Sequence, residues 1–325
     1  MTGAHLFAIA WSPDPSVFGG SLALAVAYLA WLRRGLSTRA IVFLTGVAVM
    51  VFALVGPLDR IGELYLFSVH MVQHLILILV VPPLLLWGLP PQPTRGLLRV
   101  GAVRRVERVL GRPLVALPVA IVTLWGWHLP ALYDLALRNE SVHALEHLLF
   151  LATATMFWWP VLRPDAEHRL SPPAAMAYLF AGMASDAGLG IALTFSPTPL
   201  YGFYAHPPDP YGALPLVRET WRVSVLSDQQ MGGLAMWIPG GIFYIVAILA
   251  EFGLWFREPE ADEIATSGPV QRPDVRHAQD AAGAVTARDS VPSQREVRSA
   301  APTSPPALMS RHESVAFGGI LEGAR

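Results

Sequence analysis

The stretch His70-Met71-Val72-Gln73-His74 decides what kind of protein this sequence encodes. Two imidazoles stand four residues apart inside an apolar run, residues 64–87, that is long enough to cross a bilayer as a helix. Residues i and i+4 lie on one face of a helix, so both histidines point the same way. A polar side chain in hydrocarbon needs a partner and usually faces the interior of a helix bundle. The run therefore predicts a spanning helix that carries half of a binding site.

A second histidine pair, His143 and His147, has the same spacing at the start of another apolar run. One intramembrane histidine is most simply explained by a hydrogen bond between helices. Two such pairs at one depth favour a metal or haem site instead. Glu146, beside the second pair, fits three roles equally well: a ligand, a partner that orients an imidazole, or a hydrogen-bonded residue at the helix start.

The composition is that of a polytopic membrane protein. Hydrophobic residues make up 53% of the chain and charged residues 14%, and the mean hydropathy is +0.45. A formal net charge of -1 predicts no binding to nucleic acid. Cysteine is absent, which excludes disulfides, thiolate metal sites and iron–sulfur clusters and leaves histidine, methionine and carboxylates as metal ligands.

The arginines predict the topology, because cytoplasmic loops of membrane proteins are enriched in positive charge. They flank the first connection, at Arg33, Arg34 and Arg39, and they accumulate between Pro90 and Arg112. Both connections are therefore expected in the cytoplasm, which places the N-terminus outside and the C-terminus inside. The N-terminus has no signal-peptide pattern, so we expect the first span to be retained. The predicted spans are residues 17–32, 40–56, 64–87, 113–127, 142–161, 174–195 and 230–256.

The predicted fold class is thus an all-α integral membrane bundle of seven transmembrane helices, residues 1–258, in the plasma membrane. After Arg257 the sequence changes to alanine, serine, proline and charged residues. Such a composition cannot bury a core. Residues 259–325 are therefore predicted to form a disordered cytoplasmic tail.

This topology collects the candidate ligands near the outer face. His70 and His74 meet His143 and His147 at one depth, while His128 ends the fourth predicted span. Asp228 opens the seventh, either as a ligand or as the N-cap of its own helix, and Asp186 is expected to face the bundle. Imidazole with optional thioether and carboxylate ligands suits copper best, then zinc. A haem with one axial histidine from each pair is the alternative.

These same residues carry a resemblance to a known family. The motifs are HMVQH at His70, WGWHLP at Trp125, HALEH at His143 followed by FWWP, and DQQMGGLAMW at Asp228. Over residues 15–257 the chain resembles the CtaG family of polytopic cytochrome c oxidase assembly factors. The resemblance implies a seven-span membrane protein that matures haem–copper oxidase by delivering copper to it. The matching site residues would be His70, His74, His128, His143, His147 and Asp228.

The sequence therefore predicts a membrane assembly factor for cytochrome c oxidase that binds copper near the extracytoplasmic face. Its partners would be oxidase subunits and the lipid bilayer. We expect no enzymatic activity, since no nucleophile–base pair, phosphate loop or nucleotide motif is present. Two alternatives stay open. One is a bis-histidine haem-binding redox protein, and the other is a copper transporter, which would need polar or methionine positions throughout the inner halves of the spans.

Overall fold

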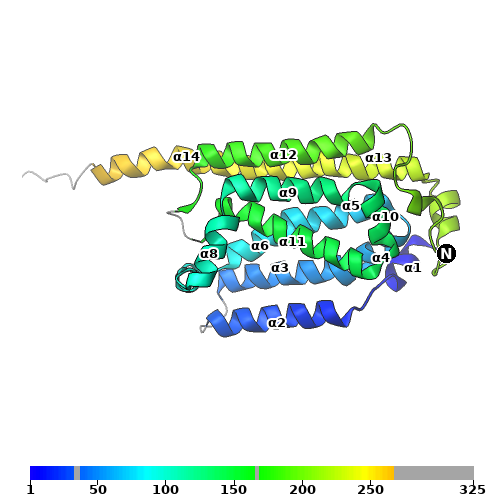
Figure 1. Cartoon of the computed structure of the whole chain (residues 1–325), viewed down its shortest axis with the longest axis horizontal. Helices are drawn as coiled ribbons and strands as arrows, with labels where there is room; N and C mark the ends of the chain where they lie inside the picture. Colours follow the sequence, from blue (N-terminus) through cyan, green and yellow to red (C-terminus); the bar gives the residue numbers. More distant parts are fainter. Residues whose placement is uncertain (33–36, 165–167, 267–325) are drawn as a thin grey trace, which may run out of the picture. The chain divides into compact units, whose positions relative to one another are not determined.

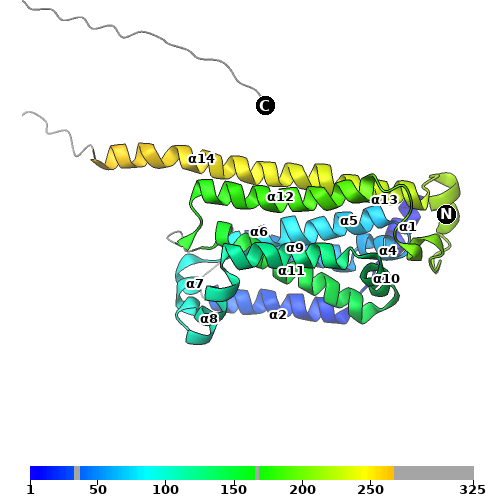
Figure 2. The same cartoon turned by 45° about the horizontal axis from the view of Figure 1, so that its top comes forward.

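The computed structural model describes residues 1–32, 37–164 and 168–266, with side chains as far as Phe256 (Figures 1 and 2). These residues form helices and no strand, so the all-helical prediction is confirmed for them. Six helices, two of them interrupted by a π-helical turn, dominate the fold. They are α2 (Pro15–Leu32), α3 (Thr38–Val55), α5 and α6 (Phe67–Leu75 and Val81–Gly88), α11 (Glu140–Leu162), α12 (Pro172–Thr194), and α13 and α14 (Val225–Ala235 and Gly241–Thr266).

The long helices run side by side, and the short elements gather at the two ends of this bundle (Figures 1 and 2). One end carries α1 (Gly3–Ile9), α4 (Pro57–Leu64), α10 (Pro130–Arg138) and the segment 195–224. We call it the histidine end. The other end carries α7 (Pro91–Leu98) and α8 (Gly101–Leu110), which hold most of the arginines between Pro90 and Arg112. We call it the arginine end.

Six helices are long and apolar enough to cross a membrane, in keeping with a multi-pass membrane protein. A seventh span results only if α8 and α9 (Pro113–Trp127), which meet at a bend of 69°, are counted as one. Alone, the 15 residues of α9 rise roughly 22 Å, less than the ~30 Å of a hydrocarbon core. Helix α14 continues past the boundary predicted at residue 258 to Thr266. The tail from residue 267 lies outside the described residues.

A π-helical turn, Ile76–Val80, interrupts the third span directly after His74. Pro82 follows it and has no N–H to give the carbonyl four residues earlier. That carbonyl, of Ile78, instead accepts a hydrogen bond of 2.9 Å from the indole Nε1 of Trp158. Trp158 lies on α11, so a proline in one span creates the acceptor that ties it to another.

Close packing also fixes the start of the third span. A Cβ on Gly62 in α4 would lie 2.8 Å from the backbone nitrogen of His70 and 2.9 Å from its Cα. Only glycine therefore lets α4 approach α5 at this level. Phe67, one turn earlier, stacks on Tyr201 with ring centroids 4.8 Å apart. These contacts hold the first histidine of the third span in place.

Candidate metal centre

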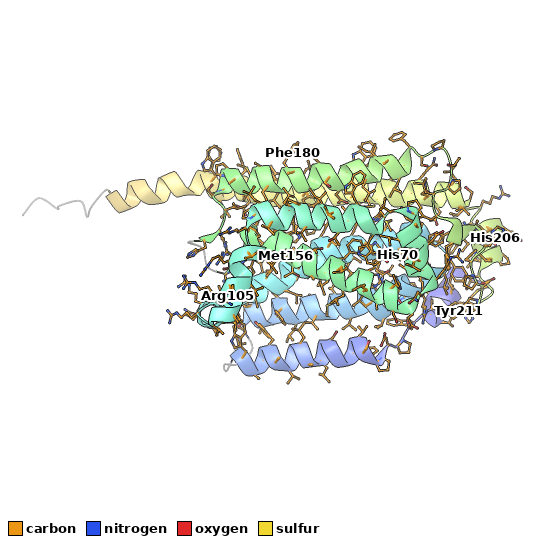
Figure 3. The ribbon with its side chains drawn as sticks, in the orientation of Figure 1. His70, Arg105, Met156, Phe180, His206 and Tyr211 are labelled. Carbon is orange, nitrogen blue, oxygen red and sulfur yellow. The ribbon has the colours of Figure 1, made fainter. Side chains whose placement is uncertain are left out.

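The two predicted histidine pairs face each other across α5 and α11 near the histidine end, where Figure 3 marks His70. Ring centroids are 5.2 Å apart for His70 and His143 and 5.5 Å apart for His74 and His147. All four side chains are buried, from 0% exposure for His70 to 8% for His147. The structure therefore brings together the pairs that the sequence placed at one depth.

The start of α11 sets the direction of its pair. The side chain of Asn139 accepts hydrogen bonds from the backbone N–H groups of Ser141 and Val142, which is the usual contact of an N-cap. His143 then falls in the first turn and His147 in the second, one above the other on the face toward α5. Phe150 continues this face, with its ring centroid 4.6 Å from that of His74. An aromatic side chain thus closes the cluster on the side of the arginine end.

Asp228 forms hydrogen bonds to the start of α5. Its carboxylate accepts hydrogen bonds from the backbone N–H of Phe67 (2.7 Å) and from the N–H and hydroxyl of Ser68. Helix α5 has no side-chain cap of its own, so Asp228 caps it from α13. The prediction that Asp228 could cap its own helix does not describe these contacts, because Ser224 and Ser227 form the capping box of α13. Asp228 supports the histidines by holding the helix that carries two of them.

His128 follows the end of α9 and joins the cluster from a third side, with its ring 5.9 Å from that of His74. Its Nδ1 lies 2.7 Å from the carbonyl of Leu124. A carbonyl only accepts, so Nδ1 carries the proton and Nε2 is bare in the neutral ring. Burial lowers the pKa of His128 to about 4, which keeps the ring neutral at physiological pH. The bare Nε2 lies 3.3 Å from the sulfur of Met71.

Several buried polar atoms of the cluster have no hydrogen-bond partner among the described residues. They are Nδ1 of His70 and His74, Nε2 of His143 and His147, and both carboxylate oxygens of Glu146. The side chain of Glu146 is fully buried, and its nearer oxygen lies 3.9 Å from Nε2 of His74. An unsatisfied buried polar group costs about 1–3 kcal/mol. A fold that retains several at one place is typical of a binding site.

Three groups of residues have ligand atoms within 4.8 Å of one another. They are His70, His74 and His147; Asp59, His143 and His147; and His70, His143 and Glu146. Nitrogens bound to one ion at about 2 Å lie roughly 3 Å apart, so small rotations of the rings would close each group. Imidazoles, carboxylates and a thioether, without thiolate, form a donor set that fits copper.

Three further residues of this region, Asp59, Gln73 and Met71, were not predicted from the sequence. Asp59 lies on α4, in a segment expected to be an outer turn, and its carboxylate accepts a hydrogen bond of 3.0 Å from Gln73. Gln73 also donates to the carbonyl of Ala53. Gln73 and Met71 stand inside the HMVQH motif, so their place between the two histidines was the available signal. Nothing in the sequence indicated that α4 folds against α5.

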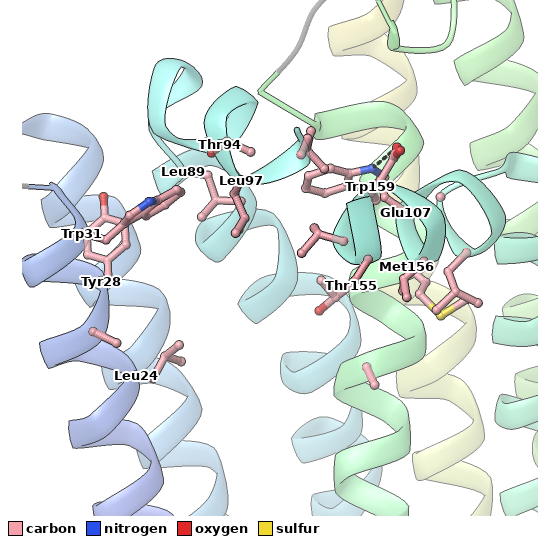
Figure 4. A pocket seen from close by; sticks show the side chains of 18 of the residues that line it. Leu24, Tyr28, Trp31, Leu89, Thr94, Leu97, Glu107, Thr155, Met156 and Trp159 are labelled. Atoms are coloured by element: carbon pink, nitrogen blue, oxygen red, sulfur yellow. Dashed lines mark hydrogen bonds between the residues drawn. The ribbon is translucent and has the colours of Figure 1, made fainter. Parts of the chain in front are cut away.

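An apolar cavity lies away from the histidines, toward the arginine end (Figure 4). It measures about 830 Å³ and lies between α2, α3, α7, α8 and α11. Its walls are mostly leucine, valine and aromatic side chains, and its carboxylate, Glu107, accepts a hydrogen bond from Trp159. No histidine lines it. The candidate metal centre and this apolar cavity are therefore separate features.

A family model described as cytochrome c oxidase caa3 assembly factor (Caa3_CtaG) matches residues 23–258. The chain belongs to this family. The resemblance seen in the sequence motifs is thereby confirmed. The matched region contains the five clustered histidines, Glu146 and Asp59.

Uncharacterized proteins of Mycobacterium bovis and Mycobacterium tuberculosis are each 29% identical to the chain over 272 residues. A Mycobacterium leprae protein is 26% identical over 276 residues. These matches cover 76–78% of this Caa3_CtaG chain but only 40% of each relative. The chain thus spans about two fifths of the length of the curated relatives that it matches. No solved structure matches it.

Proposed function

We propose that this Caa3_CtaG protein binds copper with the buried histidines of α5 and α11 and delivers it to cytochrome c oxidase. It works in the plasma membrane, with the histidine end and the N-terminus outside and the arginine end in the cytoplasm. Copper is the cargo in this proposal, so the protein acts as a carrier in assembly and catalyses no reaction.

One observation carries the proposal: two histidine pairs face each other in a bundle interior and keep bare or unpartnered nitrogens there. His70 and His74 share a proton between their Nε2 atoms, which lie 2.7 Å apart. A neutral imidazole has one N–H and one lone pair, so that proton must move to Nδ1 of its own ring before both Nε2 atoms can bind one ion. Copper binding should therefore change the tautomer of one of the two imidazoles.

The residues of the cluster have different proposed roles. His70, His74 and His147 form the group of three imidazoles that would hold the ion. Glu146 lies beside them without a hydrogen-bond partner among the described residues, so its carboxylate would offset the positive charge that copper brings into the bundle. Asp228 is left out of the ligand set, because both of its oxygens accept hydrogen bonds at the start of α5. It is assigned the role of fixing α5.

The two alternatives have less support. A haem needs space between its axial histidines, yet no histidine lines the cavity of about 830 Å³. A copper transporter needs polar positions beyond the cluster. Below His74, Phe150, Leu79 and Trp158 belong to one apolar cluster. Asp186 on α12 is a buried polar residue in this region, and its carboxyl oxygens have no hydrogen-bond partner among the described residues.

The test is copper content of the purified full-length protein, with a visible spectrum recorded on the same sample. His74→Asn and His147→Asn should each lose most of the copper, because asparagine keeps a polar partner for helix packing but is a poor copper ligand. His206→Asn is the matched control, since His206 is exposed in the loop at the same end. Both site variants should also lower the amount of active oxidase in cells.

Unchanged copper in both site variants would overturn the copper site. A Soret band that disappears with the same substitutions would instead establish the haem alternative. Because the control removes a histidine from the same end of the protein, an equal loss in all three variants would indicate adventitious surface binding.

A further inference from the structure

A second cavity reaches the histidine cluster from the histidine end. It measures about 310 Å³ and lies between the starts of α2 and α11, the end of α3, and α4. Ser12, Asp14 and Ser16 line it where α2 begins, and His143 and His147 line it on the side of the bundle interior. The Nε2 atoms of both histidines are buried and have no hydrogen-bond partner among the described residues. The cavity therefore reaches the two residues that carry these unpartnered nitrogens.

The charged residues of this cavity favour a cation. Its lining holds four carboxylates, on Asp14, Asp59, Glu63 and Glu140, against one guanidinium, on Arg60. Arg60 is paired with Glu63 at 2.9 Å, which leaves the carboxylates of Asp14 and Glu140 as the excess charge. Hydrogen bonds from Ser16 hold the pKa of Asp14 below its ordinary value, so this residue stays anionic. A cleft lined by one sign of charge concentrates ions of the opposite sign.

Asp59 links the cavity to the metal centre. Its carboxylate forms one candidate group with His143 and His147, and His147 also belongs to the group with His70 and His74. Asp59 is 8% exposed, so it stands at the inner end of the cavity and not at the surface. His147 is thus shared by the group with Asp59 and His143, which borders the cavity, and the group with His70 and His74, which lies behind it.

We propose that Asp59, His143 and His147 form an outer copper position, through which the ion passes from the acidic cavity to His70, His74 and His147. This proposal rests on the proposed function and adds its entry route. The ion would move by exchanging ligands around His147, which stays bound throughout. Asp59 supplies the negative charge that draws the cation out of water and does not belong to the final ligand set.

Asp59 also accepts a hydrogen bond from Gln73, and a purely structural role would rest on that contact alone. Asp59→Asn keeps an oxygen acceptor for Gln73 and removes only the charge. Gly20→Phe offers an independent test. Gly20 lines the cavity and an added Cβ meets nothing within 4 Å, so phenylalanine can fill the space without displacing protein atoms. Gly19→Phe is its matched control on the same helix, since Gly19 is equally open and does not line the cavity.

The experiment uses the full-length protein in detergent and offers Cu(I) as a coloured chelator complex, so that loading rate and final content are read from one trace. Asp59→Asn and Gly20→Phe should load at least about tenfold more slowly, the lower end of what electrostatic focusing contributes to on-rates. Their final copper content should equal that of the unmodified protein, and Gly19→Phe should load normally. Added salt should slow loading by screening the carboxylates near the mouth.

Three outcomes would overturn the proposal. Normal loading in Gly20→Phe would mean that copper enters elsewhere. Loss of final copper content in Asp59→Asn, the result expected of a His74 variant, would make Asp59 a ligand of the inner site. Normal loading in Asp59→Asn would leave it with the structural role only. If the unmodified protein binds no copper at all, the proposed function itself is wrong, and that result is distinct from the other three.

Discussion

The two cavities lie between the same two helices, α2 and α11, yet they have opposite chemistry. At the histidine end α11 contributes Glu140, His143 and His147, whereas toward the arginine end it contributes Thr155, Met156 and Trp159. The backbone is helical throughout, from Glu140 to Leu162. A change of side chains along one helix therefore turns a polar cavity into an apolar one.

Polar groups are also treated differently at the two ends. Toward the arginine end, the hydroxyl of Tyr28 donates to the carbonyl of Gly88 at 2.8 Å, and Glu107 accepts from Trp159 and pairs with Arg163. At the histidine end, His143 and His147 keep unpartnered nitrogens. Satisfied polar groups stabilise a fold, and unsatisfied ones are retained where they bind something. Among the described residues, Nε of Arg163 is also unpartnered toward the arginine end, but the unpartnered imidazole nitrogens lie together at the histidine end.

The largest expected effect concerns which end of the bundle faces out of the cell. It is tested by cysteine labelling, where a position either reacts or does not. The chain has no cysteine, so a single introduced cysteine reports one position. His206→Cys places a thiol at the histidine end, and Gly101→Cys places one at the arginine end, where an added Cβ meets nothing within 4 Å. On intact cells, a membrane-impermeant maleimide should label only His206→Cys.

Permeabilised cells provide the control, since both thiols should then react. Labelling of Gly101→Cys from outside would reverse the predicted orientation and place the histidine end in the cytoplasm. The copper proposal would then need a cytoplasmic source of the ion.

The next effect contrasts stability with binding. Trp158→Ala removes a fully buried ring and its hydrogen bond to Ile78, and it should lower the free energy of unfolding by about 3–5 kcal/mol. His147→Leu should leave the stability of the metal-free protein unchanged or raise it, because an unsatisfied buried nitrogen costs about 1–3 kcal/mol. The same His147 variant should lose its copper.

Thermal unfolding and copper content of the same two samples check both halves of this prediction. A metal-free His147→Leu protein that unfolds as easily as Trp158→Ala would contradict it. That result would mean that the His147 ring stabilises the metal-free fold, as a packing residue does.

Much of this contrast could be predicted from sequence, and the reasons differ by element. Residues 142–161 and 64–87 were predicted as spans because long apolar runs are a strong signal, and the i, i+4 spacing placed each histidine pair on one face. The interruption of the third span could not be predicted in the same way. It depends on the carbonyl freed by Pro82 finding an indole from α11, a contact between distant parts of the chain.

The candidate site was predicted in part. Facing histidine pairs follow from spacing and depth, whereas Asp59 reaches the cluster only because α4 folds back against α5. Asp228 was predicted either as a ligand or as the N-cap of its own helix, and the family resemblance placed it among the site residues. Its contacts with Phe67 and Ser68 depend on where α13 lies relative to α5, which no local pattern encodes.

A smaller effect is expected from Asp228, and it separates support from ligation. Asp228→Ala should lower stability by about 1–2 kcal/mol, the usual cost of losing a helix cap. Asp228→Asn should cost less, since asparagine also caps helices. Both variants should bind the full amount of copper at saturation. Ser224→Ala, which removes the cap of α13, is the matched control, and loss of copper in Asp228→Asn alone would return Asp228 to the ligand set.

The smallest effect concerns Met71, which lies between the two histidines of α5 and contacts a third. Its sulfur and the bare Nε2 of His128 lie 3.3 Å apart, and two lone pairs gain nothing from facing each other. An ion bound at about 2.0 Å to nitrogen and about 2.3 Å to sulfur would bring both into use. A thioether favours Cu(I) over zinc. Met71→Leu should therefore weaken Cu(I) binding by about tenfold, the low end for replaced metal partners.

Leucine conserves the volume of methionine, so the fold should lose less than about 1.5 kcal/mol. Met156→Leu is the matched control, because Met156 lines the apolar cavity of the other end. Competition with chelators of known affinity should show weaker Cu(I) binding in Met71→Leu, unchanged zinc binding in both variants, and unchanged Cu(I) binding in the control. Equal losses of Cu(I) and zinc in Met71→Leu would mean that the substitution disturbs His70 and His74 through the helix. The Met71 sulfur would then not contribute to selectivity for Cu(I) over zinc. The imidazoles alone would determine which metal binds at the histidine end.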